Sequence, residues 1–265
     1  MKMTCVAAAV ASISISVMIN AGHVDHQRMN GVHLQQAEIP GSFMAIEIIK
    51  LIDDPRLRLG VIEITGGTVE PASQELRQTG AGLAARIGAA DYEIPEDQRR
   101  AVRQLLKIGG FSPSGRNRPA HELLVRDIKE RGSFHHINNI VDVNNVISLV
   151  SLLPISIFDG AKLKNTLTVR IGKPEEGYVF NQSGQWLDVK KCIACCNGDP
   201  PGEPIGTPVK DSMVTKIFEG ASHYVGIIYG STDGCSDEEL AAVTQRFGEL
   251  LASESGGEIA QCRII

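Results

Sequence analysis

The alternation of apolar and polar residues along the chain predicts a set of strands separated by glycine and proline. The segment Leu57–Thr65 reads LRLGVIEIT, is rich in aliphatic and β-branched residues, and stops at Gly66 and Gly67. Shorter apolar runs separated by Gly and Pro predict further strands at 166–171, 178–180, 185–189 and 223–229.

Apolar residues at helical spacing predict five helices. They cover 71–87, the stretch from Pro95 to Gly109, 119–132, 140–150, and a closing helix after Ser236, where Ser236 and Glu239 form a capping box. Helices and strands come in blocks rather than in strict alternation. This order favours an α+β fold over a doubly wound one.

Length and composition are those of a globular chain whose N-terminal segment differs from the rest. The chain has 265 residues, of which 43% are hydrophobic and 22% charged. The pattern changes at Met44, so we expect an N-terminal extension over 1–43, either signal-like or an over-extended start, and a single domain over 44–265. The apolar run 5–19 is too short to span a membrane, and we expect a cytoplasmic protein without a membrane partner.

The charge distribution is uneven. The formal net charge is −5, which provides no global positive field for phosphate. Between residues 99 and 131, however, nine basic residues face three acidic ones. The basic residues are Arg99, Arg100, Arg103, Lys107, Arg116, Arg118, Arg126, Lys129 and Arg131. This segment either binds an anion or forms a solvated helix face.

Motifs for cofactor chemistry are missing from the sequence. It contains no Gly-rich dinucleotide loop, P-loop, zinc-protease motif or nucleophile elbow, so we expect no nucleotide cofactor. Cys192, Cys195 and Cys196 include the C-x2-C spacing of a zinc knuckle, but no second such pair exists. We therefore expect reduced thiols, no metal and no other cofactor.

Five Asn and Asp residues lie within eight positions of the predicted helix 140–150 and its start. They are Asn138, Asn139, Asp142, Asn144 and Asn145. Such residues are poor helix formers because their side chains compete for backbone hydrogen bonds. The cluster indicates either helix capping with a buried hydrogen-bond network or a face that makes specific polar contacts.

The region around this cluster resembles a known family. The segments 136–149 (HINNIVDVNNVISL) and 153–159 (LPISIFD) are similar to the B3/B4 domain of the phenylalanyl-tRNA synthetase beta subunit, where a helix of the type N-x-V-V-D-x-x-N leads into P-x-H-A-F-D. The stretch 162–170 resembles the strand that follows in that domain, and 111–126 resembles the lead-in helix of stand-alone B3/B4 proteins. The resemblance spans roughly 57–252.

The resemblance implies a three-layer β/β/α sandwich and an association with tRNA. In the synthetase this domain hosts the pocket in which a wrongly attached tyrosine is hydrolysed from tRNA, whereas aminoacylation belongs to a separate subunit. Five positions match the motif: Asn139, Asp142, Asn145, Phe158 and Asp159. Ser156 stands where the synthetase has the histidine associated with editing, and Glu219 resembles the acidic position of its pocket.

Three functions remain open. The first is binding of tRNA or aminoacyl-tRNA without chemistry, with Arg116, Arg118 and Arg126 on phosphates. The second is a free-standing deacylase in which a bound water attacks the aminoacyl ester, with Asp142 or Glu219 orienting the water and Ser156 or backbone N–H groups stabilising the oxyanion. The third is a module that binds a small molecule or a protein, because a fold does not determine a function.

Overall fold

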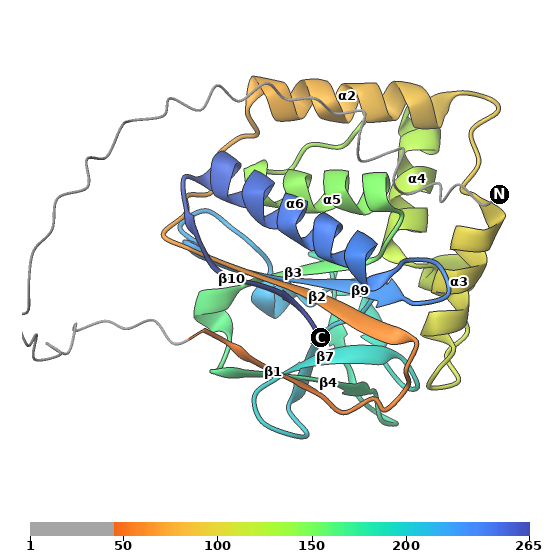
Figure 1. Ribbon diagram of the computed structural model, residues 1–265, viewed down its shortest axis with the longest axis vertical. Coiled ribbons are helices and arrows are strands. Elements are labelled where there is room, and N and C mark those ends of the chain that lie inside the picture. The colour runs from red at the N-terminus through yellow and green to blue at the C-terminus, as the bar shows by residue number, and fades with distance from the viewer. Residues whose placement is uncertain (1–44) are drawn as a thin grey trace, which may run out of the picture.

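The computed structural model describes residues 45–265 of the chain (Figure 1). The predicted N-terminal extension and the alternative start at Met44 lie outside the described residues. None of the helices within 45–265 is long and apolar enough to cross a membrane.

Two four-stranded sheets form two of the three layers. The outer sheet has the order β1-β4-β7-β8, and the central sheet has the order β10-β2-β9-β3. The outer sheet consists of β1 (Glu47–Lys50), β4 (Thr166–Ile171), β7 (Ile193–Asn197) and β8 (Glu203–Gly206). The central sheet consists of β10 (Glu258–Ile264), β2 (Leu57–Thr65), β9 (His223–Ser231) and β3 (Ile155–Asp159) and is antiparallel throughout.

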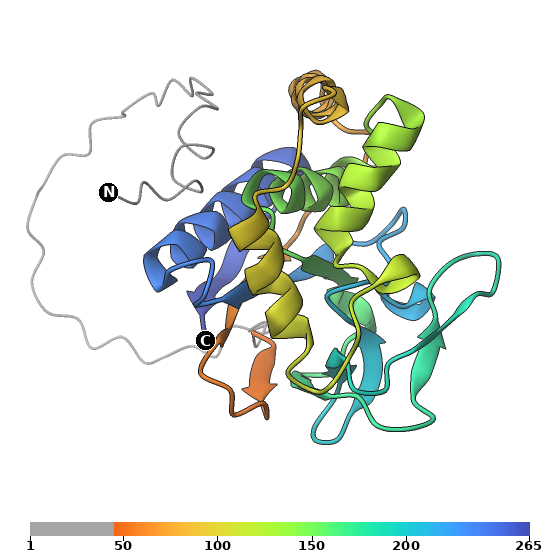
Figure 2. The ribbon, with the colours of Figure 1, turned by 90° about the vertical axis from the view of Figure 1, so that its right-hand side faces the viewer.

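Helices cover the other face of the central sheet and form the third layer. They are α2 (Gln74–Gly88), α3 (Glu96–Leu106), α4 (Ala120–Arg131), α5 (Asn139–Ser151) and α6 (Asp237–Ser255). Helices α5 and α6 lie side by side on the sheet, and α2 and α4 pack against α5 from outside (Figures 1 and 2). This arrangement is the predicted three-layer β/β/α sandwich.

The period of two in the central strands explains the layering. In β2, Leu57, Leu59 and Val61 point between the two sheets, whereas Ile62 and Ile64 belong to the core under the helices. Strand β9 alternates in the same way. Both faces of the central sheet are therefore buried, which requires a covering layer on each side.

A small hairpin and three 3₁₀ turns complete the described chain. The hairpin pairs β5 (Gly177–Val179) with β6 (Trp186–Asp188), and the turns are η1 (Gly115–Asn117), η2 (Gly160–Lys162) and η3 (Met213–Thr215). Figure 2 shows the hairpin projecting beyond the sheets, on the side of α4.

The predicted helices and strands are present with small shifts at their ends, and the predicted capping box of Ser236 and Glu239 is formed. Sequence analysis missed strands β1, β3, β7, β8 and β10. Strand β3 lay hidden in the segment read only as a motif, and β7 lay in the cysteine segment read as a candidate metal site. Both are short and buried, so no polar alternation marks them.

Candidate functional site

A groove of about 1740 Å³ lies between the helices and the loops that connect the two sheets. Its floor includes Ile155 and Ile157 of β3, and one wall comes from α4 and α5. The opposite wall comes from residues 207–219 and from the tip of the hairpin, 180–185. Chain segments far apart in the sequence thus meet at one concave surface, as ligand sites usually require.

The start of α5 is held by its own polar residues. Asn138 caps the helix by accepting from the Val141 N–H (2.9 Å). Asn139, the next residue, is fully committed: its Oδ1 accepts from the Glu70 N–H, and its Nδ2 donates to the carbonyls of Thr68 and Glu254. Asn139 therefore ties α5 to the segment after β2 and to the end of α6, and it does not line the groove.

Asp142 is completely buried and holds the segment before the helix. Its carboxylate accepts from the Ile137 N–H (2.8 Å) and lies 2.7 Å from Nδ1 of His136. Both oxygens are used in shaping the rim where His135 and His136 stand. The polar cluster is thus partly a capping network, which was one of the two interpretations left open by the sequence.

Three polar side chains of α5 beyond its first turn face the groove, although the hydroxyl of Ser148 already donates to the Leu153 carbonyl at 2.7 Å. Asn144, Asn145 and Ser148 all line it, and Nδ2 of Asn144 donates to Oδ1 of Asn145 at 3.3 Å. The buried Oδ1 of Asn144 has no hydrogen-bond partner within residues 45–265. The polar cluster therefore also includes groups that reach the groove.

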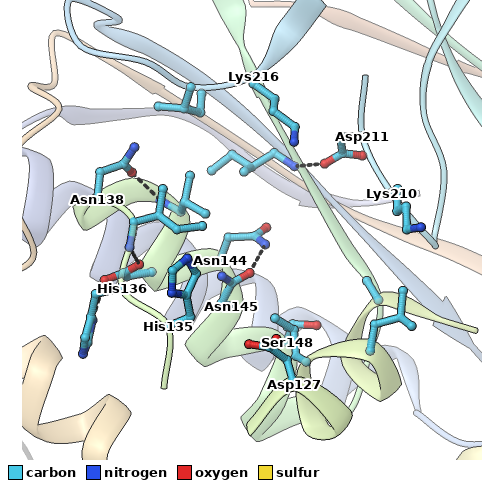
Figure 3. Close-up of a pocket in the computed structure, with 18 of the residues that line it drawn as sticks. Asp127, His135, His136, Asn138, Asn144, Asn145, Ser148, Lys210, Asp211 and Lys216 are labelled. Atoms are coloured by element: carbon cyan, nitrogen blue, oxygen red, sulfur yellow. Dashed lines mark hydrogen bonds and ion pairs between the residues drawn. The ribbon is translucent and has the colours of Figure 1, made fainter. Parts of the chain in front are cut away.

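The wall opposite α5 carries three charged residues that sequence analysis did not single out. Figure 3 shows Lys210, Asp211 and Lys216 on this wall, across from Asn144 and Asn145. Burial lowers the pKa of Lys216 below its usual range, an effect that Asp211 opposes. Burial also lowers the pKa of Lys210, and the positive charges of Arg116 and Arg126 lower it further.

Asp211 is the most perturbed acid of the groove. Burial raises its pKa to about 7, although the hydrogen bond from the Ile157 N–H favours the ionised form. Its Oδ2 accepts from that N–H at 3.2 Å, whereas Oδ1 is without a partner in the described structure. A Cβ on Gly206 would lie 2.7 Å from Oδ1, so only glycine at this position leaves room for the carboxyl group.

Part of the basic segment is neutralised by nearby carboxylates. Arg103 forms a two-pronged pair with Glu122, at 2.7 and 2.6 Å. Arg99 pairs with Glu96, Arg126 with Glu130, and Arg131 with Asp127. Four of the nine positive charges thus belong to a salt-bridged helix surface. Arg116 and Arg118 have no ion pair with any described residue.

Of the ten residues that the sequence predicts for the family motif, the catalytic pocket or RNA binding, five line the groove: Asp142, Asn145, Glu219, Arg116 and Arg126. The other five do not: Ser156, Asn139, Phe158, Asp159 and Arg118.

Ser156 and Phe158 are on the face of β3 turned toward the outer sheet. The hydroxyl of Ser156 is 3.1 Å from Oη of Tyr229 and 3.3 Å from the carbonyl of Thr207. Phe158 belongs to the core between the sheets. Asp159 caps η2 through the Ala161 N–H and pairs with Lys162 at 3.0 Å.

Most groove residues that sequence analysis missed come from two loops. They are Phe180 at the hairpin and Lys210, Asp211, Lys216 and Phe218 on the opposite wall, together with His135 before α5 and Ser148 on α5. The loop residues carry no periodicity, so the pattern of the sequence did not mark them.

Four of the described cysteines, Cys192, Cys195, Cys196 and Cys235, are buried free thiols. Burial raises the pKa of Cys192 and of Cys196 to about 12, which keeps both protonated at neutral pH. Among residues 45–265, no group of three His, Cys, Asp or Glu side chains is placed to hold a metal ion.

Comparison with known proteins finds a family model and several solved structures. Residues 113–207 match the model of the B3/4 domain. An N-terminal fragment of the phenylalanyl-tRNA synthetase beta subunit from Pyrococcus horikoshii is similar at 11% identity and a TM-score of 0.42, covering 81% of this chain. The chain spans 50% of that fragment's length, and no curated protein sequence matches it. The predicted resemblance to the B3/4 domain is thus confirmed over residues 113–207.

Proposed function

We propose that this chain binds tRNA or aminoacyl-tRNA in the groove between α5 and the 207–219 wall. The observation that carries the proposal is the gathering of Arg116, Arg126 and Lys210 at one part of the groove, close enough for the two arginines to lower the pKa of Lys210. Of these cations, only Arg126 has a described carboxylate partner, at 3.5 Å. Cations that repel one another are stabilised by an anion, and RNA phosphates supply such anions.

The B3/4 match supports the same proposal independently of charge. The family model ends at residue 207, at the edge of the loop that forms the second wall. The groove is therefore built partly from the matched region, through η1, α4, α5 and β3, and partly from the segment that follows it. We place the RNA backbone over Arg116 and Lys210 and the bound end of the RNA inside the groove.

Neutralising the cations tests the proposal. Replacing Arg116 and Lys210 together by Gln removes two phosphate contacts, so the slope of log affinity for tRNA against log salt falls by about 1.4 to 1.8. The affinity loss is the same for different tRNAs, because phosphate contacts carry no sequence information. Fluorescence anisotropy with labelled tRNA at several salt concentrations measures both quantities.

Arg100→Gln is the matched control. Arg100 is exposed on α3, lies outside the groove lining and has no described ion pair, so its loss leaves the slope unchanged. Arg118→Gln tests the predicted phosphate contact of a half-buried arginine beside the groove. An unchanged slope in the Arg116/Lys210 variant, or an equal loss in the Arg100 variant, overturns the proposal.

Hydrolysis of an aminoacyl ester is the second candidate, favoured by Asp211. An acid with a pKa of about 7 is suited to accept a proton near neutral pH. In this reaction a water oxygen bonds to the ester carbonyl carbon, the carboxylate accepts the water proton, and the ribose oxygen leaves with that proton. Lys216 is the cation on the same wall, available to the oxyanion.

Release of amino acid from a panel of mischarged tRNAs measures this activity. Asp211→Asn, Asp142→Asn and Glu219→Gln separate the possible water-orienting groups, and Ser156→Ala tests the predicted oxyanion donor. Turnover that depends on Asp211 with a pH midpoint near 7 supports hydrolysis. If tRNA binds but no ester is cleaved, the chain is a binding module. If neither occurs, binding of a small molecule or a protein becomes the better proposal.

A further inference from the structure

Phe218 is an exposed aromatic ring on the groove wall. Phe218 belongs to the loop between η3 and β9, and its side chain lines the groove and is 45% exposed. Nζ of Lys162 lies 5.4 Å from the ring centroid and is held there by Asp159 and by the carbonyl of Lys216 (3.2 Å). The Phe218 carbonyl accepts from the Ala221 N–H at 3.1 Å, so the turn that carries the ring is closed by its own backbone.

A second ring faces the groove from the hairpin. Phe180 lines the groove, and Nζ of Lys210 lies 3.9 Å from its centroid. The hairpin tip is ordered by bonds from the Phe180 N–H to the Gln185 carbonyl and from the Gln185 N–H to Oδ1 of Asn181. The groove therefore presents two aromatic rings from different segments, each with a lysine ammonium close to it.

This pairing matches the chemistry of an unpaired nucleotide. Aromatic side chains stack on the faces of bases, and lysines contact the adjoining phosphates. Two carboxylates near the ring, Asp159 and Glu219, repel an anion. Asp159 already pairs with Lys162, which neutralises its charge, and Glu219 is exposed to solvent beside the ring. Asp211 holds its proton over part of the neutral range and so repels an anion less. The net arrangement favours a base on the ring with its phosphate toward Lys210 and Arg116.

We infer that the groove takes a single-stranded RNA end, with Phe218 as the stacking platform for one of its bases. A duplex does not fit this role, because its bases are already stacked on one another and their faces are not available. This inference rests on the proposed function and narrows it from tRNA in general to an unpaired segment of it.

Binding of a labelled six-nucleotide RNA tests the inference directly. Phe218→Ala weakens its binding about tenfold, because one base loses its platform. Phe218→Trp binds the RNA as tightly as the parent does, since a larger ring stacks at least as well. Val214→Ala is the matched control, because Val214 is a 68% exposed apolar residue of the same segment that does not line the groove. We expect the Val214→Ala variant to bind the RNA as tightly as the parent does.

Intact tRNA and a duplex of the same composition complete the experiment. The parent binds the single strand more tightly than the duplex, and Phe218→Ala abolishes that preference. Equal binding of both probes, or an equal effect of the Val214 and Phe218 changes, overturns the inference. If tRNA binds with the Arg116/Lys210 salt dependence while the single strand does not bind, the inference fails and the proposed function stands. If neither RNA binds, both fail.

Discussion

Two buried carboxylates, one between the sheets and one at the groove, are treated very differently by the fold. Glu63 on β2 uses both oxygens: Oε1 lies 2.8 Å from Nε2 of His223, and Oε2 accepts from the Ile46 N–H at 3.0 Å. Asp211 uses Oδ2 alone, and its Oδ1 has no described partner. A satisfied buried acid stabilises the fold, whereas an incompletely satisfied one is a candidate for function.

The same difference holds between the layers. The core between the sheets is filled by aliphatic residues with Phe158 and Tyr229, and the hydroxyl of Tyr229 contacts both Ser156 and Cys195. The layer under the helices contains the groove, with the unpaired Oδ1 of Asn144 and the wall of Lys210, Asp211 and Lys216. One layer is optimised for stability, and the other keeps polar groups available for a ligand.

Removing the satisfied acid has the largest expected effect on stability. Glu63→Ala leaves His223 without this partner and the Ile46 N–H of the β1 entry without an acceptor. We expect a loss of about 3 to 5 kcal/mol in the free energy of unfolding. Urea denaturation measures it. Glu203→Ala, at an exposed position of β8, is the control and leaves the midpoint in place. Equal midpoints for the two variants would contradict the structural role of the pair.

Asp211 is expected to act on stability with the opposite sign. Its pKa is raised from 3.8 to about 7, so the folded protein retains a proton that the unfolded chain releases between these values. Stability therefore falls as the pH rises through this window. Asp211→Asn removes this loss: we expect it to stabilise the protein at pH 8 by about 2 to 4 kcal/mol and to change little at pH 4. A variant that is equally or less stable than the parent at pH 8 would show that the carboxylate is well satisfied.

Asp142 is expected to have the smallest effect of the three. Asp142→Ala removes the acceptor for the Ile137 N–H and the partner of His136, at a cost of about 1 to 3 kcal/mol. His136 is partly exposed, so water replaces one of the two bonds. The midpoint of urea denaturation measures this loss. Asn145→Ala is the control, because it removes a side chain of similar size whose amide, among the described residues, is hydrogen-bonded to Asn144 alone. If the two changes cost the same, Asp142 has no special role in ordering the segment before α5.

Local patterns predicted most of the helices because each carries its own signals. The capping box at Ser236 and the apolar spacing of α5 needed no tertiary information. Strands β3 and β7 were missed because both are short and buried, which leaves no polar alternation, and β10 because its pairing with β2 is set by a distant segment. The resemblance to the B3/4 domain supplied the layer order that periodicity alone did not.

The site was harder to predict because it depends on the direction in which side chains point and on charged residues that come from distant parts of the chain. Ser156 lies next to two groove residues in sequence, yet the period of two in β3 turns it toward the other sheet. The basic segment has an excess of positive charge in the sequence. In the fold, Glu122 on α4 reaches Arg103 on α3 and neutralises that arginine. Asp211 and Lys216 stand in loops, where only the folded structure shows that they share a wall.

The location of bound RNA tests the central claim most directly. Ultraviolet cross-linking of tRNA carrying a photoreactive 3′ nucleotide, followed by mass spectrometry of the attached peptides, maps that location without any substitution. The account predicts cross-links within residues 180–185 and 207–219, the two loop walls of the groove. Cross-links confined to α3 or to the exposed strand β10, with none on these loops, would contradict it.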